Sequence, residues 1–186
     1  MASLQAMTAL GARGAAVIEI GPLRITERTD LALASVAARR GRMADLAAAA
    51  KSAGVPLPEA ARHQAGAPYS AFWTAPEMWF VEAPYGSHEL IADLLKTALG
   101  DAASITEQTD AWVAFDLAAA DLAPVLEHLC NVDFRSAPKG YATRTVMEHL
   151  GVYLVKLDQG AVRLYGPRSS AQSLLHALEA AAASAW

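Results

Sequence analysis

Residues that could carry chemistry gather most closely in the stretch LYGPRSSAQSLLHALEA, which runs from Leu164 to Ala180. A β-like run passes there through Gly166 and Pro167 into a helix that opens on Arg168 and two serines. A glycine turn, an arginine and hydroxyls at a helix N-terminus are the parts of a phosphate-holding loop, and equally those of an ordinary helix cap. The further glycines or lysine typical of close phosphate contact do not follow, and both interpretations stay open at this point.

The side chains that could bind a metal or act as nucleophiles are scattered. The five histidines include no pair at three- or four-residue spacing, so the sequence predicts no helical metal pair. His128 and Cys130 are two residues apart on a predicted helix and point to different sides. Cys130, the one cysteine, ends an apolar helix with no motif placing a base beside it. It is expected to be a small buried filler rather than a nucleophile.

Acid–base chemistry finds equally little support. Asp110 lies in a predicted turn, Asp121 at a predicted helix start, and Asp116 near the end of an alternating strand, where an outward carboxylate is routine. Asp133 has no partner that demands a shifted pKa. The sequence contains no GxSxG, Walker or GxGxxG motif. We therefore assign no catalytic, cofactor-binding or metal-binding residue.

Phe72, Trp73, Trp79 and Phe80 form the densest aromatic group of the chain. Neighbouring side chains of a strand point to opposite faces, so Trp79 and Phe80 can both be buried only if both faces of their hairpin are covered. A loop could cover the second face, or a partner protein could dock there, since aromatic residues are enriched at interfaces. We take these four residues, with Arg168, as a predicted partner interface.

Bulk composition narrows the class of protein. The chain has 186 residues, 54% hydrophobic and 18% charged, with a net charge of −4 and a pI near 5.7. The net negative charge of the chain argues against nucleic-acid binding, although residues 39–42 form a short basic cluster. No uninterrupted apolar run reaches the roughly 18 residues of a membrane span. Few charges on a small domain favour a surface that another chain covers.

The elements that must position these residues read as strands and helices in mixed order. Pro76 is expected at the second position of a type I turn within a hairpin. The helix after Ser87 is expected to present Leu90, Ile91, Leu94 and Leu95 as one apolar face. Strands are expected at 23–28, 31–39, 71–73, 78–82, 103–108, 111–117, 143–150, 151–157 and 161–167, and helices at 42–53, 87–100, 121–130 and 169–183.

This order predicts an α+β fold with mixed, mostly antiparallel sheets and helices. The strands at 103–108 and 111–117 are expected to join directly at Thr109-Asp110, and those at 143–150 and 151–157 to be broken at Gly151. Residues 1–20 are expected to form a flexible N-terminal arm without a signal peptide. One domain follows over 21–186, in two pseudo-repeated halves at about 21–100 and 101–186. The single cysteine is compatible with a reducing cytoplasm.

From Thr26 onward the chain resembles the gamma subunit of heterotetrameric sarcosine oxidase. The resemblance rests on the order and spacing of several stretches rather than on one motif. These are TERTDLALASVAARRG, AFWTAPEMWF, TEQTDAWVAFDL, LCNVDFRSAPKGYATRTVMEHLGVYLVKL and VRLYGPRSSAQSLLHAL.

The resemblance implies a subunit of a complex that oxidises sarcosine with molecular oxygen to glycine and hydrogen peroxide, and forms methylenetetrahydrofolate when tetrahydrofolate is present. It implies alpha, beta and delta partner subunits, with FAD, FMN, NAD and zinc on those partners and none on this chain. The implied fold is that of the folate-binding aminomethyltransferases (glycine-cleavage T-protein). The implied role is structural: a non-catalytic assembly subunit in the cytoplasm, able to form a homo-oligomer when isolated.

Two alternatives remain. The chain could be a folate-binding module of the T-protein type, although the sequence identifies no set of aromatic and carboxylate residues that would bind a pterin. It could also be a stand-alone interaction protein of the same fold. For the closing helix the resemblance favours the cap, with Ser169 accepting hydrogen bonds from free first-turn amides. Arg168 is electrostatically unfavourable at the positive end of a helix, which points to a carboxylate or a partner nearby.

Overall fold

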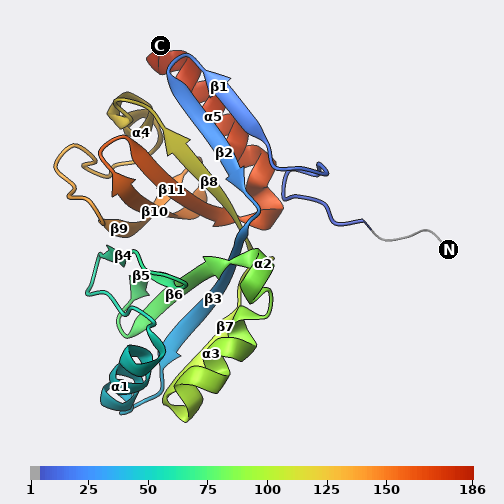
Figure 1. Cartoon of the computed structure of the whole chain (residues 1–186). Coiled ribbons are helices and arrows are strands. Elements are labelled where there is room, and N and C mark those ends of the chain that lie inside the picture. Colours follow the sequence, from blue (N-terminus) through green and yellow to red (C-terminus); the bar gives the residue numbers. More distant parts are fainter. Residues whose placement is uncertain (1–4) are drawn as a thin grey trace. The chain divides into compact units, whose positions relative to one another are not determined.

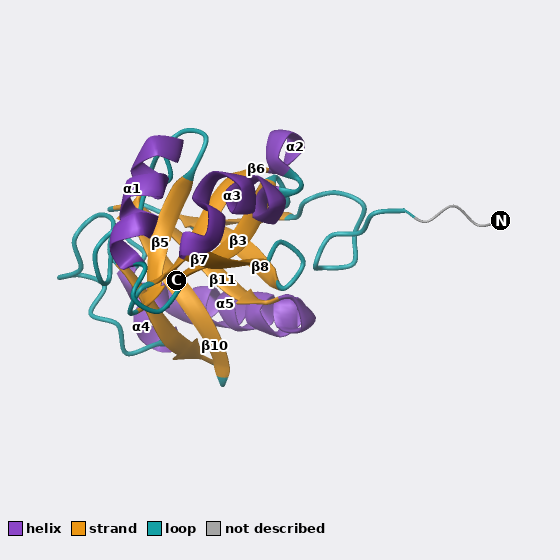
Figure 2. Ribbon diagram, turned by 90° about the horizontal axis from the view of Figure 1, so that it is seen from below, coloured by secondary structure: helices purple, strands orange, loops and turns teal. Residues whose placement is uncertain are grey.

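The structure is a computed structural model that describes residues 5–186. Its contacts divide these residues into two compact units. One unit takes the chain up to Thr29, together with Ala111–Lys139 and Arg144–Trp186, and the other takes Asp30–Asp110 and Gly140–Thr143. Each unit is an antiparallel sheet with helices packed on one face (Figures 1 and 2). The predicted α+β class is confirmed.

The first unit is built on a six-stranded sheet in the order β1-β2-β8-β11-β10-β9. The strands are β1 (Val17–Ile20), β2 (Leu23–Arg28), β8 (Trp112–Ala118), β9 (Ala142–Met147), β10 (Leu150–Asp158) and β11 (Ala161–Pro167). The helices are α4 (Ala123–Leu129), the 3-10 turn η2 (Arg168–Ser170) and α5 (Ala171–Ala185). In Figure 1, α5 (red) lies beside β1 and β2 (blue).

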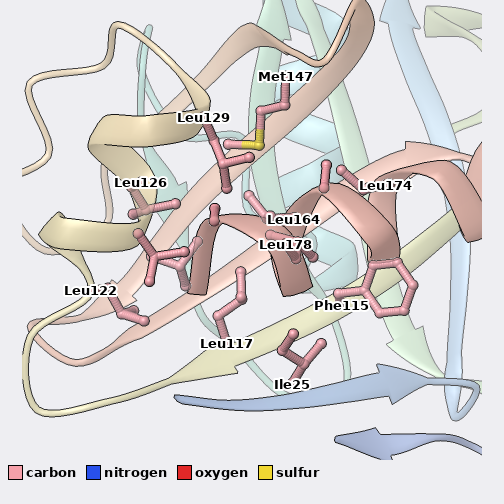
Figure 3. Close-up of a cluster of buried hydrophobic side chains, with 14 of the residues drawn as sticks. Ile25, Phe115, Leu117, Leu122, Leu126, Leu129, Met147, Leu164, Leu174 and Leu178 are labelled. Atoms are coloured by element: carbon pink, nitrogen blue, oxygen red, sulfur yellow. The ribbon is translucent and has the colours of Figure 1, made fainter. Parts of the chain in front are cut away.

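Alternation along the strands creates the core of this unit. Every second residue of β8 faces the helices, so Val113, Phe115 and Leu117 are buried together. Leu174 and Leu178, one turn apart on α5, pack against this face, as Figure 3 shows. Burying such side chains contributes about 1.5–3 kcal/mol each, which is what holds the helices on the sheet.

The second unit is built on a five-stranded sheet in the order β4-β5-β6-β3-β7. The strands are β3 (Leu31–Ala38), β4 (His63–Gln64), β5 (Ser70–Ala75), β6 (Met78–Pro84) and β7 (Ala103–Glu107). The helices are α1 (Met43–Ala53), the one-turn α2 (Tyr85–His88), α3 (Ile91–Leu99) and the 3-10 turn η1 (Gly100–Ala102). Leu46 of α1 and Leu95 of α3 are fully buried in one cluster with Ala34 and Val36 of β3.

Two predicted strand connections are wrong. β7 and β8 follow each other in the chain but belong to different sheets, because β7 pairs with β3 whereas β8 pairs with β2 and β11. The break before β10 comes at Glu148 and His149, not at Gly151. Both residues have positive φ, 45° and 68°, which is the backbone of a tight hairpin turn.

Two further local predictions are wrong. The turn after β5 is not type I, because Glu77 has a φ of 57° where type I requires a negative value. The helix predicted from Ser87 is broken at Leu90, whose φ of −96° and ψ of 48° are not helical. The buried stripe of α3 consequently runs through Ile91, Leu95 and Leu99, while Leu94 is exposed.

The predicted arm, residues 1–20, contains a strand. Val17–Ile20 forms β1 and pairs with β2, with Ile18 and Ile20 packed on the core. Residues 1–4 of the arm lie outside the described residues. The organisation of 21–186 as one domain with halves near 21–100 and 101–186 stays a prediction, and the two compact units draw on other segments than these halves.

Candidate functional site

The aromatic hairpin β5–β6 places its four rings in two facing pairs. Register pairs Trp73 with Trp79 and Phe72 with Phe80, so the tryptophans share one face of the sheet and the phenylalanines the other. The tryptophan face belongs to the helix-covered core, where the Trp79 indole donates a hydrogen bond of 2.8 Å to the carbonyl of Pro58. The Phe72 and Phe80 rings meet edge to face, with centroids 5.5 Å apart.

Burial separates the members of the predicted interface. Phe72, Trp79 and Phe80 are 1%, 5% and 7% exposed, so their rings are covered by this chain itself, and their part in a partner interface stays a prediction. Trp73 and Arg168 are half-buried and accessible. A partner interface that includes these two residues stays a prediction. Both faces of the hairpin carry buried rings, which is the condition that the sequence set for Trp79 and Phe80.

Arg168 contacts the N-terminal segment, residues 7–16. Its guanidinium donates a hydrogen bond of 2.9 Å to the carbonyl of Met7, and Gln172 donates one of 3.0 Å to the carbonyl of Leu10. The predicted Ser169 cap is wrong. Neither η2 nor α5 begins with a side-chain cap, because the chain enters α5 through the 3-10 turn and Ser170 occupies its N-cap position.

A buried carboxylate also binds this N-terminal segment. Glu27 is 2% exposed, and its two oxygens accept hydrogen bonds from the backbone amides of Leu10 and Ala16, at 3.2 Å and 3.1 Å. Such a carboxylate satisfies two amides that would otherwise be left without acceptors. Nothing in the sequence singled out Glu27, because its partners are backbone groups that carry no sequence signal.

The polar face of the six-stranded sheet carries a compact ionic cluster. The Asp116 carboxylate accepts two bonds from the Arg163 guanidinium, at 2.6 Å and 2.9 Å, and a third of 2.5 Å from Arg28. Register explains the arrangement, since Asp116 stands opposite Arg163 on β11. The carboxylate oxygens are thus occupied by fixed donors, which makes Asp116 a cross-strand tie rather than an acid or base. The sequence pattern did not identify Arg28 or Arg163 as partners of Asp116.

A pocket of about 460 Å³ lies in the second unit, between α1 and the connection that follows it. Its apolar wall includes Met43 and Leu57, and its polar groups are Lys51, Gln64 and Tyr69. The Tyr69 hydroxyl is a hydrogen-bond donor at neutral pH, as any tyrosine hydroxyl is, and partial burial raises its pKa further. An aromatic ring, an amide and an ammonium group around an apolar wall suit a flat ligand that carries an anion.

The remaining predicted candidates take local roles. Asp121 accepts a hydrogen bond of 3.0 Å from the amide of Ala123 at the start of α4. The Asp133 carboxyl has a lowered pKa because Ser136 donates to it. Burial raises the pKa of the Cys130 thiol, and its sulfur lies 3.6 Å from the carbonyl of Leu126. Within residues 5–186, no three His, Cys, Asp or Glu side chains gather as a metal site would need.

The basic cluster at 39–42 is engaged with acidic neighbours at the surface. Arg39 lies 3.6 Å from Asp101, and Arg42 pairs with Asp45 in the first turn of α1. Across the described part of the chain, none of the helices combines the length and apolarity that crossing a bilayer requires.

No family model and no curated protein matches the chain. Among solved structures, it is similar to a chain of the heterotetrameric sarcosine oxidase from Corynebacterium sp. U-96, solved in complex with pyrrole 2-carboxylate. The two chains share 23% identity over 90% of this chain and 87% of the other, with a TM-score of 0.76.

The glycine cleavage system aminomethyltransferase T from Bartonella henselae is also similar, at 14% identity with a TM-score of 0.56. That match covers 82% of this chain but 44% of the aminomethyltransferase chain. At these identities the two likenesses establish the fold. The predicted similarity to the aminomethyltransferase fold is confirmed.

Proposed function

We propose that the chain is a gamma-type assembly subunit of a sarcosine-oxidase-type heterotetramer. The observation that carries this proposal is reciprocal coverage: 90% of this chain and 87% of the sarcosine oxidase chain superpose with a TM-score of 0.76. The match to the aminomethyltransferase covers a smaller share of the other protein, 44% of its chain. Similar length and fold favour the same place in an assembly over a part of a larger enzyme.

The proposed role is to supply shape. The buried ionisable groups described above are engaged in internal contacts: Glu27 holds backbone amides and Asp116 ties two arginines. In the proposed complex, alpha, beta and delta subunits carry FAD, FMN, NAD and zinc and perform the oxidation in the cytoplasm. Sarcosine then yields glycine, its methyl carbon passes to tetrahydrofolate as methylenetetrahydrofolate, and oxygen takes the electrons to become hydrogen peroxide.

Co-expression tests the proposal. The chain, expressed with the reading frames that neighbour its gene, is expected to co-purify in a stoichiometric assembly that contains flavin and oxidises sarcosine. Alone, the chain is expected to show no oxidase activity. A lone chain that oxidises sarcosine, or a flavin-containing oxidase that assembles fully without this chain, would contradict the proposal.

The pocket beside α1 favours a second candidate function, folate binding. A pterin could lie against the Tyr69 ring while the glutamate tail of folate meets the Lys51 ammonium. Titrating the isolated chain with tetrahydrofolate tests this. Binding tighter than about 100 μM, near −5.5 kcal/mol, that weakens in Lys51→Glu and not in the surface control Lys139→Glu would favour it. No saturable binding would leave the assembly role alone.

A further inference from the structure

The α2–α3 region of the second unit exposes a set of large apolar side chains. Tyr85, Leu90 and Leu94 are 37%, 66% and 43% exposed. Leu90 and Leu94 lie next to each other across one helical turn, since the amide of Leu94 donates to the carbonyl of Leu90 at 3.1 Å. Single exposed apolar residues are ordinary, but three on one short segment are typical of a contact surface. We call these three residues the α2–α3 patch.

Acidic groups surround this patch. The Tyr85 hydroxyl donates a hydrogen bond of 3.0 Å to Glu89, and Glu107 lies at the start of α3, 3.4 Å from the amide of Ala92. The pKa of Tyr85 is raised, first by the Glu89 hydrogen bond and then by the Glu89 charge.

The lysine of α3 is already paired with a carboxylate. Lys96 of α3 lies 3.2 Å from Asp93, and this ion pair neutralises itself. The carboxylates of Glu89 and Glu107 thus place negative charge beside the apolar side chains. A surface of this kind is complementary to an apolar side chain flanked by lysine or arginine.

We propose that the α2–α3 patch docks a partner subunit through an apolar side chain flanked by basic residues. This inference rests on the proposed assembly function and names the surface that performs it. A second copy of the chain is a poor occupant. In a two-fold contact the patch would meet itself, which brings the like charges of Glu89 and Glu107 from both copies together.

The apolar part of the contact is tested in the co-expressed complex. Leu90→Gln/Leu94→Gln removes apolar surface at two exposed positions, so the fold is expected to persist with an unchanged urea midpoint. Affinity for the partner subunits is expected to fall at least about tenfold. Val146→Gln is the matched control, since Val146 is 59% exposed on β9 outside the patch. This control is expected to bind as the wild type does.

The charged part is tested by reversal. Glu89→Lys is expected to weaken assembly, and the wild-type complex is expected to weaken as salt is raised, more steeply than the complex of Glu89→Gln. Glu59→Lys makes the same change of charge at an exposed position away from the patch and is expected to have no effect.

The outcomes separate the two proposals. Wild-type assembly with variants that bind equally well would overturn the patch and leave the assembly role standing. A wild-type chain that binds none of the neighbouring subunits would overturn the assembly role, and the patch with it. A lone chain that dimerises in sedimentation, and no longer does so as Leu90→Gln/Leu94→Gln, would also overturn the proposal, because the occupant would then be a second copy.

Discussion

At the scale of single residues, the carboxylate of Glu27 has a structural role that could not be predicted from its position in β2. It is buried and accepts the amides of Leu10 and Ala16. Glu27→Ala would leave both amides without an acceptor, and each buried unsatisfied group costs about 1–3 kcal/mol. We expect the free energy of unfolding, measured by urea titration, to fall by about 2–4 kcal/mol.

Glu27→Gln is the informative control for this prediction. Its amide oxygen can still accept one hydrogen bond, while its amide nitrogen faces a second donor, so the loss should lie between those of wild type and alanine. Glu19→Ala, at an exposed position of the neighbouring strand β1, is expected to change the unfolding free energy by less than about 0.5 kcal/mol. Equal stability of wild type and Glu27→Ala would show that the carboxylate does not hold the N-terminal segment.

The Cys130 thiol gives a second prediction at this scale. Burial raises its pKa, and the reactive species is the thiolate, so the native chain is expected to react with iodoacetamide several-fold more slowly than the urea-unfolded chain. Because the pKa is raised, the native rate should level off at a higher pH than the rate of the unfolded chain. Mass spectrometry of the alkylated cysteine measures both rates, and identical native and unfolded rates would contradict the expectation.

At the scale of elements, the local sequence pattern predicted most of the strands and helices but not which strands pair with one another. The alternation of LRITER predicts β2 because its inward residues, Leu23 and Ile25, are those that the core needs. The same kind of pattern could not show that β7 and β8 enter different sheets, since pairing depends on which distant strand each one meets. The break at Leu90 was hidden because Leu90 and Leu94 imitate a core-facing stripe.

The hairpin between β10 and β11 offers a prediction about an element. A side chain at Gly160 would bring its Cβ to 2.3 Å from the backbone carbonyl of Ala119, which cannot move without shifting the end of β8. Gly160→Ala is therefore expected to cost about 1–3 kcal/mol of unfolding free energy. Gly86→Ala is the control, since nothing lies within 4 Å of its Cβ in helix α2. If both variants melt at the wild-type temperature, a side chain at position 160 does not clash with the Ala119 carbonyl, and the prediction is wrong.

At the scale of the whole molecule, the chain returns to its first unit after building its second. β2 and β8 are neighbours in one sheet although the whole of Asp30–Asp110 lies between them in sequence. The two successive halves predicted from the sequence describe the order of the elements, but they do not describe the return of the chain to its first unit. The candidate contacts share the difficulty: Asp116 meets Arg28 and Arg163 only after three strands have come together. The aromatic hairpin is local, so its alternating faces could be predicted.

Folding and assembly should separate at the two tryptophans of that hairpin. Trp79 is 5% exposed, and its indole donates to the carbonyl of Pro58. Trp79→Ala is expected to cost about 3–5 kcal/mol, a large part of the roughly 5–15 kcal/mol that stabilises a domain. Trp73 is half-buried, so Trp73→Ala should cost clearly less and leave a folded chain.

If Trp73 contributes to the partner contact, the folded Trp73→Ala chain should lose affinity for the co-expressed subunits out of proportion to its change in melting temperature. Trp79→Ala should instead lose stability first, with its assembly recovering when the temperature is lowered enough to refold the chain. Thermal melts and co-purification at two temperatures measure both effects. Equal losses of melting temperature in the two variants would reject the separation, because they would place both rings equally in the core.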